Sequence, residues 1–391
     1  MVSRTDRSPL AEWLWTIDRY MLFGVIFLMA SGIVLSMAAS PPVAERLGVD
    51  PMHFVKRQAF FLGPALAVLL GVSALSPRLV RRVALLGLVG AVGMLVATLF
   101  IGYEIKGARR WVSLFGYSLQ ASEFVKPTLI VIIAFLLSEA PRRPEVPGNF
   151  ISILLYLIVA ALLIVQPDFG QTILVSVVVA ALFFVNGLSW FAIGPLLMLG
   201  VGGFFAAFTY LPHVRSRIMR FIDPSSGDTY QIDKAIDSFV SGGWFGRGVG
   251  EGTVKRILPD SHTDFIFAVA AEEYGILLSV VIVSVFAMVV LRGLYMAMQE
   301  QDPFSRLSVV GLVSLFGLQS CINMAVNLNL IPPKGMTLPF ISSGGSSLLA
   351  MALTMGFVLA LTRRRPQPRK TPGVFGGRFA ATRKSPKDEA A

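Results

Sequence analysis

Long apolar runs separated by short polar segments make up most of the chain. A helix needs roughly 20 residues to cross a bilayer core of ~30 Å. Runs of this length, bounded by Pro, Gly and charged residues, predict ten spans near residues 20–40, 58–75, 81–103, 122–138, 149–166, 168–186, 189–210, 264–292, 305–331 and 341–362. The predicted fold class is all-α, a polytopic transmembrane helical bundle, because helices satisfy their own backbone groups in lipid.

The two ends of the chain are polar and basic. The run from Tyr20 to Ser40 is too long for the apolar segment of a signal peptide, which spans about 7–15 residues, so we expect a retained first span. An even number of spans returns the chain to its starting side. Basic flanks favour the cytoplasm, which predicts a cytoplasmic tail at 1–19, a transmembrane domain at 20–362 and a basic, disordered cytoplasmic tail at 363–391.

Composition supports membrane insertion and excludes several kinds of chemistry. Hydrophobic residues make up 54% of the 391 residues and charged residues only 15%, which is untypical of a soluble protein. The net charge of +11 is concentrated in the C-terminal tail and is read as a topology signal rather than as a nucleic-acid site. The single cysteine, Cys321, excludes an internal disulfide, and three scattered histidines give no metal triad.

One long polar loop, residues 211–263, separates the seventh and eighth spans and is expected outside the cytoplasm. Connections of this length usually carry function. Apolar residues at helical spacing between Tyr230 and Val240 predict an amphipathic helix, either on the membrane surface or packed against spans. The Gly-rich segment 242–252 lacks the strand and the Gly-Lys-Ser/Thr of a nucleotide-binding loop.

A carboxylate, Asp264, stands at the mouth of the eighth predicted span. Ionisable residues at this depth are costly and mark functional sites. The apolar residues 265–267 would disfavour its charged form, as a general base requires; stabilisation by the helix dipole is the alternative. Glu272 and Glu273 lie roughly 12 Å deeper, too far for a hydrolytic carboxyl pair, and are expected to pair with polar groups inside the bundle.

Three other polar clusters fall at predicted span ends. In the first, Glu123 and Lys126 share a helix face, and Arg110 or Lys126 could bind phosphate, with a structural ion pair as the alternative. Trp111 fits the headgroup level. In the second, Asp168 is expected to cap the next helix. The third, 327–347, begins a Gly/Ser-rich span whose free amides suit an anion or whose small residues permit close packing.

These clusters contain motifs that resemble those of the SEDS family (shape, elongation, division, sporulation), over residues 18–365. Weaker similarities favour the cell-division branch over the elongation branch. One departure is Asp260, where many relatives carry Glu, and it keeps the charge. The motifs are Gly-x-x-Arg110-Trp111, Ser122-Glu123-Phe-x-Lys126, Gln166-Pro-Asp-x-Gly170, His262-Thr-Asp264-Phe-Ile-Phe and Leu338-Pro-Phe-x-Ser-x-Gly-Gly-Ser.

The resemblance implies a peptidoglycan glycosyltransferase that polymerises lipid II into glycan strands during septal wall synthesis and releases undecaprenyl pyrophosphate. It implies that Asp264 is the general base on the acceptor 4-hydroxyl, that Arg110 and Lys126 stabilise pyrophosphate, and that Glu123 orients Lys126. The substrate-binding residues it implies are Arg110, Trp111, Gln120, Ser122, Glu123, Lys126, His262, Thr263, Lys334, Ser343, Gly344, Gly345 and Ser346.

The resemblance also implies a cellular location and binding partners. The chain is expected in the bacterial inner membrane at the division septum, with both termini cytoplasmic. Partners would be lipid II, the nascent glycan strand, a class B penicillin-binding protein (FtsI), other division membrane proteins and membrane lipid, without nucleic acid. The sequence indicates no definite cofactor, and a divalent cation (Mg²⁺ or Mn²⁺) beside the pyrophosphate is compatible with it. The alternatives are a lipid II flippase, an elongation-type polymerase and a non-catalytic scaffold.

Overall fold

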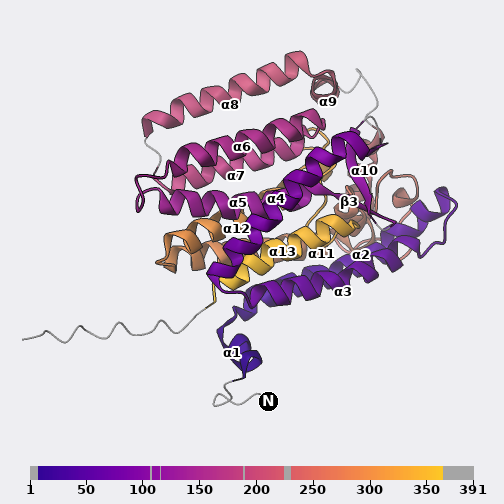
Figure 1. Cartoon of the computed structure of the whole chain (residues 1–391). Helices are drawn as coiled ribbons and strands as arrows, with labels where there is room; N and C mark the ends of the chain where they lie inside the picture. The colour runs from indigo at the N-terminus through magenta and orange to yellow at the C-terminus, as the bar shows by residue number, and fades with distance from the viewer. Residues whose placement is uncertain (1–7, 106–107, 115, 188–189, 224–229, 364–391) are drawn as a thin grey trace, which may run out of the picture.

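The computed structural model describes residues 8–105, 108–114, 116–187, 190–223 and 230–363 (Figure 1). The predicted C-terminal tail, 363–391, therefore lies outside the described residues except for Arg363. In the predicted N-terminal tail, the described part forms a short helix, α1 (Pro9–Thr16), which begins behind the capping side chain of Ser8.

Each of the ten predicted spans coincides with a helix, which confirms the all-α membrane fold. Among the described residues, seven helices are long and apolar enough to cross a membrane, and two shorter apolar helices cover Phe169–Val185 and Gly345–Leu361. The helices run lengthwise beside one another (Figure 1). They are α2 (Arg19–Arg46), α3 (His53–Ser73), α4 (Pro77–Ile101), α5 (Ala121–Glu139), α6 (Gly148–Val165), α7 (Phe169–Val185), α8 (Trp190–Tyr210), α11 (Ile266–Gln299), α12 (Pro303–Asn327) and α13 (Gly345–Leu361).

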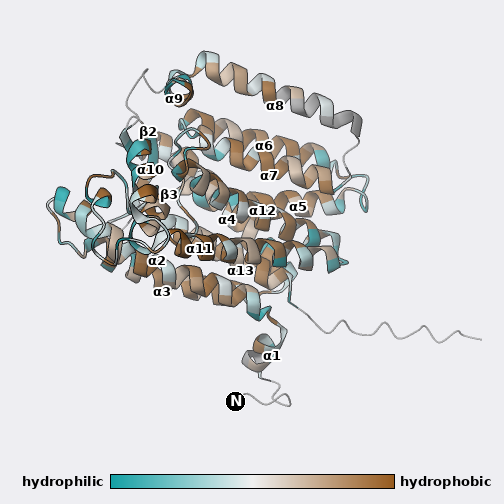
Figure 2. Cartoon of the chain, turned by 180° about the vertical axis from the view of Figure 1, so that it is seen from behind, coloured by the Kyte–Doolittle hydropathy of each residue, from teal (hydrophilic) through white to brown (hydrophobic). Residues whose placement is uncertain are grey.

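Helix α5 lies at the centre of the bundle, where it packs against α4, α6, α7, α12 and α13. Small residues permit this close packing. An added Cβ on Gly311 of α12 would lie 2.6 Å from Ile130 of α5, and one on Gly293 of α11 would lie 2.6 Å from Val313 of α12. Hydrophobic residues cover the helices along their length, as lipid requires, while hydrophilic residues collect at the helix ends (Figure 2).

Several short elements, of which the sequence predicted only a helix near residues 230–240, gather at one end of the bundle. Strands β1 (Tyr103–Ile105), β2 (Ala108–Leu114) and β3 (Tyr117–Gln120) form an antiparallel sheet in the order β1-β2-β3. The register pairs Trp111 with Gln120. The long loop contributes α9 (Pro212–Ile222), α10 (Tyr230–Gly242) and the 3-10 turn η2 (Val254–Arg256).

Helix α10 is the amphipathic helix that the spacing predicted. Its apolar face packs against α11: Ile232 and Ala235 are buried, and the rings of Phe239 and Phe267 lie 5.7 Å apart. Packing against a span thus accounts for Ile232 and Phe239, whereas Ile236 and Val240 of the predicted apolar face are exposed and remain available to a membrane surface.

Helix α11 is broken at Gly275, whose backbone (φ 79°, ψ 179°) is not helical, so the predicted continuous span 264–292 is wrong in this respect. Residues 242–252, which we call the glycine strap, lie in the break. The strap and the helix satisfy each other's backbone groups, as irregular backbone inside a membrane protein requires. The bonds are Arg247 N to Glu272 O (2.9 Å), Gly248 N to Glu273 O (3.1 Å), Ile276 N to Gly243 O (2.9 Å) and Leu277 N to Trp244 O (3.3 Å).

The two glutamates beside the break pair within the protein, as predicted. Glu272 accepts from the backbone amides of Val254 (2.7 Å) and Lys255 (2.9 Å). Glu273 accepts from the Gly250 amide (3.1 Å) and forms a salt bridge with the buried Lys255 ammonium group. These carboxylates therefore hold the strap and η2 against α11.

Candidate active site

A cavity of about 740 Å³ opens where the sheet, α9, the start of α11 and the segment before α13 meet. Of the fourteen residues predicted from the sequence, twelve line it, and Ser122 and Lys126 do not. The twelve are Arg110, Trp111, Gln120, Glu123, His262, Thr263, Asp264, Lys334, Ser343, Gly344, Gly345 and Ser346. Motifs far apart in the sequence are thus brought to one site, although their roles stay predictions.

Asp264 is half-buried on the cavity wall, immediately before α11. Its backbone carbonyl accepts the side-chain amides of Asn323 (3.0 Å) and Asn327 (2.9 Å), both buried on α12. A Cβ added to Gly335 would lie 3.1 Å from Asp264 Oδ2. The absence of a side chain at Gly335 therefore lets the Lys334–Gly335 backbone lie against this carboxylate.

The segment that carries Asp264 is tied to the Gly/Ser-rich segment before α13. The Ser343 amide donates to the His262 carbonyl (3.0 Å), and the Ser342 hydroxyl donates to the Thr263 carbonyl (2.5 Å). Two of the predicted clusters are thus joined by hydrogen bonds, which fixes one side of the cavity.

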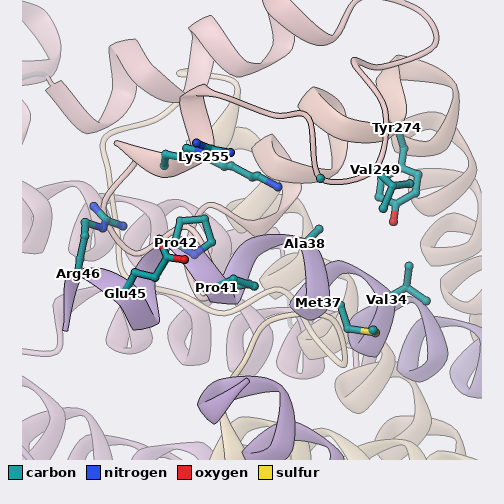
Figure 3. A pocket seen from close by; sticks show the side chains of 12 residues that line it. Val34, Met37, Ala38, Pro41, Pro42, Glu45, Arg46, Val249, Lys255 and Tyr274 are labelled. Atoms are coloured by element: carbon teal, nitrogen blue, oxygen red, sulfur yellow. The ribbon is translucent and has the colours of Figure 1, made fainter. Parts of the chain in front are cut away.

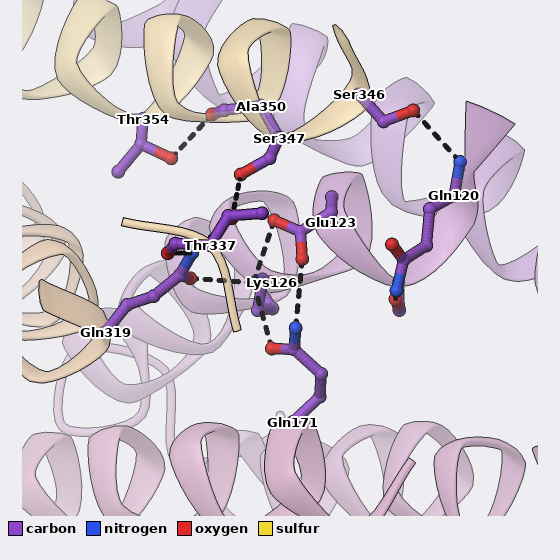
Figure 4. A network of polar contacts seen from close by, with 11 residues as sticks. Gln120, Glu123, Lys126, Gln171, Gln319, Thr337, Ser346, Ser347, Ala350 and Thr354 are labelled. Carbon is purple, nitrogen blue, oxygen red and sulfur yellow. Dashed lines mark hydrogen bonds and ion pairs between the residues drawn. The ribbon is translucent and has the colours of Figure 1, made fainter. Parts of the chain in front are cut away.

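Lys126 is fully buried and does not line the cavity, but it contacts Glu123 and Gln171, which do. Its ammonium donates to Glu123 Oε2 (3.0 Å), Gln171 Oε1 (2.9 Å) and Gln319 Oε1 (2.8 Å), as Figure 4 shows. A lysine has three donors, so this set occupies all of them. The geometry favours the structural ion pair over the phosphate ligand, the two alternatives that the sequence left open.

The network around Lys126 extends to α13 and to the sheet. Gln319 Nε2 donates to the Thr337 carbonyl (3.2 Å), and the hydroxyls of Thr337 and Ser347 lie 2.6 Å apart. At the sheet, the Gln120 amide donates to the Ser346 hydroxyl (3.1 Å) (Figure 4). Ser122, which does not line the cavity, accepts from Gln120 Nε2 (3.1 Å) and so holds the start of α5.

Arg110 joins strand β2 to the sharp turn between α6 and α7. Its guanidinium donates to the carbonyls of Gln166 (Nε, 3.0 Å) and Pro167, and lies 3.9 Å from Asp168 Oδ1. Asp168 is at the N-cap position of α7 but makes no capping bond, so the predicted cap is wrong. Its carboxylate faces the guanidinium of Arg110 instead, and Arg110 still lines the cavity.

Three cavity arginines were not predicted as site residues: Arg57, Arg217 and Arg220. Arg217 and Arg220 are three apart on α9 and share a helix face, which is a signal that the sequence contains. Burial and the neighbouring guanidinium groups of Arg110 and Arg220 lower the pKa of Arg217. Burial and repulsion by Arg217 lower the pKa of Lys334. The cavity thus concentrates positive charge that an anion would stabilise.

His262 lies in the wall with its ring 4.4 Å from that of Phe54. Burial lowers the pKa of His262 to about 4, well below its ordinary ~6.5. The imidazole is therefore neutral at physiological pH and adds no charge to the site.

No group of three or more His, Cys, Asp or Glu side chains in the described part of the chain is placed to hold a metal ion. A divalent cation in this cavity would take most of its ligands from substrate oxygens and water, as Mg²⁺ commonly does. A cation requirement stays a prediction.

The fold and the cavity define a class: integral membrane proteins with a cationic, carboxylate-bearing cavity at one end of a helical bundle. The chain belongs to the cell cycle protein family of FtsW, RodA and SpoVE, whose model matches residues 19–367. This confirms the resemblance to the SEDS proteins that the motifs indicated.

Known relatives agree over nearly the full length. A probable peptidoglycan glycosyltransferase FtsW from Caulobacter vibrioides (strain NA1000 / CB15N) is 47% identical over 378 residues, which are 96% of each chain. The crystal structure of the rod shape determining protein RodA from Thermus thermophilus superposes with a TM-score of 0.67 at 29% identity, covering 90% of this chain and 98% of that chain.

A further solved structure is described as the structural coordination of polymerization and crosslinking by a peptidoglycan synthase complex. One of its chains matches with a TM-score of 0.73 at 29% identity, covering 88% of this chain and 97% of that chain. The name of the Caulobacter vibrioides relative agrees with the enzyme class that the SEDS resemblance implied and favours the division branch.

Proposed function

We propose that this chain is a peptidoglycan glycosyltransferase of the FtsW type, which polymerises lipid II during septal wall synthesis and releases undecaprenyl pyrophosphate. The relative from Caulobacter vibrioides, with 47% identity, supports the activity. The observation that carries the site is the half-buried Asp264 carboxylate in a cavity that basic side chains also line. One carboxylate for a hydroxyl and several cations for a diphosphate are the groups that this transfer needs.

In the proposed reaction, Asp264 takes the proton of the acceptor 4-hydroxyl. The oxygen then attacks the anomeric carbon of the donor sugar, and the bond from that carbon to the pyrophosphate oxygen breaks, with its electrons leaving on the pyrophosphate. Arg110, Arg217 and Lys334 line the same cavity and would stabilise this developing charge. Because pyrophosphate is a good leaving group, no general acid is needed.

The role of Lys126 differs from the one that the resemblance implied. Since its three donors are occupied by Glu123, Gln171 and Gln319, we assign it to the support of the cavity floor. Lys334 and Arg217 replace it as candidate phosphate ligands, because both line the cavity and the pKa of each is lowered in a way that a bound anion would reverse.

The protein is an integral inner-membrane protein, since its relatives and its apolar helices agree. We further propose that both termini are cytoplasmic, that the long loop is periplasmic and that the protein acts at the septum. A class B penicillin-binding protein, FtsI, is the proposed partner. The matching chain in the peptidoglycan synthase complex supports such an assembly.

The test is polymerisation of lipid II by the purified full chain together with its class B penicillin-binding protein. Asp264→Asn should abolish polymer formation while the thermal unfolding temperature stays close to that of the native chain. Asp237→Asn is the matched control, because Asp237 is an exposed carboxylate paired with Lys234 in the long loop that precedes Asp264. Full activity of Asp264→Asn would refute the proposed base. If the native chain forms no polymer but moves lipid II across the membrane of vesicles, the protein would be a flippase instead.

A further inference from the structure

A second cavity, of about 810 Å³, lies between the outer half of α2 and the strap with its 3-10 turn (Figure 3). It shares no lining residue with the candidate active site. Its lining residues are Val34, Met37, Ala38, Pro41, Pro42, Glu45, Arg46, Val249, Gly250, Lys255, Arg256 and Tyr274. Nothing in the proposed reaction uses this space.

Polarity changes along the length of this cavity. Val34, Met37 and Ala38 line one end, and Glu45 and Arg46 line the other, on the same helix (Figure 3). At ~1.5 Å rise per residue, Val34 and Arg46 are about 18 Å apart along α2. Half of a hydrocarbon core is ~15 Å thick. With the periplasmic orientation of the long loop proposed above, a cavity of this length would reach from the periplasmic surface roughly to the middle of the bilayer.

The charged end of the cavity carries both positive and negative side chains. Arg46 and Arg256 are exposed, and Arg46 uses one N–H for the Leu258 carbonyl (2.9 Å), which leaves other donors of its guanidinium available. Glu45 is exposed at the same end. The Lys255 ammonium is neutralised by its salt bridge to Glu273. The net result is two guanidinium groups and one carboxylate above an apolar slot.

The charges favour a lipid over a helix of a partner protein. Two guanidinium groups and one carboxylate at the end of an apolar groove match the phosphate and the ammonium of a zwitterionic lipid headgroup. An acyl chain would cover the apolar residues of α2 that line the rest of the groove.

We propose that this cavity binds one phosphatidylethanolamine molecule of the outer leaflet. The phosphate lies between Arg46 and Arg256, the ammonium of the headgroup pairs with Glu45, and an acyl chain follows Val34 and Met37 along α2. Both headgroup charges then meet opposite charges, and the chain stays in apolar surroundings. A lipid bound here would fill the space between α2 and the strap, and so hold the strap against α11.

The test is native mass spectrometry of the purified full chain in detergent, titrated with phosphatidylethanolamine, phosphatidylglycerol or diacylglycerol of the same acyl chains. We expect phosphatidylethanolamine to bind at least about tenfold more tightly than diacylglycerol, and more tightly than phosphatidylglycerol. Arg256→Gln should lower binding of both phospholipids, while Glu45→Gln should remove the preference for phosphatidylethanolamine over phosphatidylglycerol. Arg142→Gln, which changes an exposed arginine after α5, is the matched control.

Three results would overturn the proposal: equal binding of diacylglycerol, unchanged binding by folded Arg256→Gln, or displacement of phosphatidylethanolamine by an equimolar amount of undecaprenyl phosphate. Arg256 is preferred to Arg46 as the variant because the side chain of Arg46 also holds Leu258. Asp264→Asn keeps this cavity intact and should bind phosphatidylethanolamine as the native chain does. Failure of the proposed catalytic function is thereby distinguished from failure of the lipid site.

Discussion

Asn323 holds Asp264 through the backbone: its side-chain amide lies 3.0 Å from the Asp264 carbonyl oxygen and 2.6 Å from that of Met336. One buried amide on α12 therefore joins the segment of the candidate base to the loop of Lys334. Asn327, one turn further on, donates to the same Asp264 carbonyl (2.9 Å) and accepts from the Ala268 amide (3.1 Å). The distance between the Asp264 carboxylate and the Lys334 loop thus depends on Asn323 and Asn327.

The first prediction concerns the two hydrogen bonds that the Asn323 side chain donates to the carbonyls of Asp264 and Met336. Asn323→Ala leaves two buried carbonyls without this donor, which costs ~1–3 kcal/mol of stability, and lets the base and the Lys334 loop move apart. Because a displacement of about 1 Å at a reacting group can cost ~100-fold, we expect kcat for lipid II polymerisation to fall by ~10–100-fold with a much smaller change in KM. Steady-state kinetics at a temperature where the variant is folded measures both.

Ser320→Ala is the matched control for Asn323→Ala. Ser320 is equally buried on α12, but its hydroxyl donates only within its own helix, to Phe316. Should the two variants lose kcat to the same extent, Asn323 would have a general structural role and no specific role in positioning Asp264.

The second prediction is a pH dependence of stability from His262. Burial lowers its pKa in the folded protein to about 4, whereas the unfolded chain protonates near its ordinary ~6.5. Between these values the unfolded state binds more protons, so the free energy of unfolding falls as the pH is lowered from ~6.5 towards 4. The loss is of the order of 3 kcal/mol at the acidic end.

Thermal unfolding between pH 7.5 and pH 4.5 tests this dependence on His262. His262→Gln should be less sensitive to acid over this range than the native chain, and His53→Gln controls for loss of an exposed imidazole at the same membrane face. An identical acid dependence in His262→Gln and in the native chain would contradict the assignment.

The third prediction separates the two readings of Lys126. Lys126→Met leaves the Glu123 carboxylate buried without its cation, and breaking a buried pair costs ~3–5 kcal/mol. The double variant Glu123→Gln/Lys126→Met removes both charges and should regain much of this stability, as unfolding temperatures in detergent would show. A double variant no more stable than the single one would mean that the buried pair is not what Lys126 stabilises.

The sequence predicted those parts of the fold that depend on local pattern. The bilayer fixes the length of an apolar helix, so each of the ten spans was found from its own residues. The sheet was missed, since its strands are short and its position depends on distant partners. Gln120 of β3, for example, bonds to Ser346, which is 226 residues away.

The sequence predicted which residues line the cavity better than it predicted what each of them does. Asp264 stands out locally as a carboxylate before an apolar helix, and the structure places it on the cavity wall. Whether Lys126 faces the cavity depends on Gln319, 193 residues away, which holds it inside the bundle. Arg217 was missed because its helical spacing with Arg220 shows only a shared helix face, while its place in the cavity depends on how α9 packs.

The last prediction concerns the strap and the break in α11. Gly275 and Gly250 both have positive φ, 79° and 86°, so an added side chain strains the backbone at each. Only at Gly275 is the space also occupied, because a Cβ would lie 2.3 Å from the Trp244 carbonyl, whereas at Gly250 nothing lies within 4 Å. Gly275→Ala should therefore displace the strap, while Gly250→Ala should cost only ~1–2 kcal/mol.

Limited trypsin digestion of the folded variants can read out this displacement, because Arg247 lies within the strap and its amide bonds to α11. Cleavage after Arg247 should be at least about tenfold faster in Gly275→Ala than in Gly250→Ala and in the native chain. Because opening of the strap also removes the Gly250 amide from the Glu273 carboxylate, the unfolding temperature should fall in parallel with protection. Equal cleavage rates in the two variants would mean that the strap does not depend on the space at Gly275.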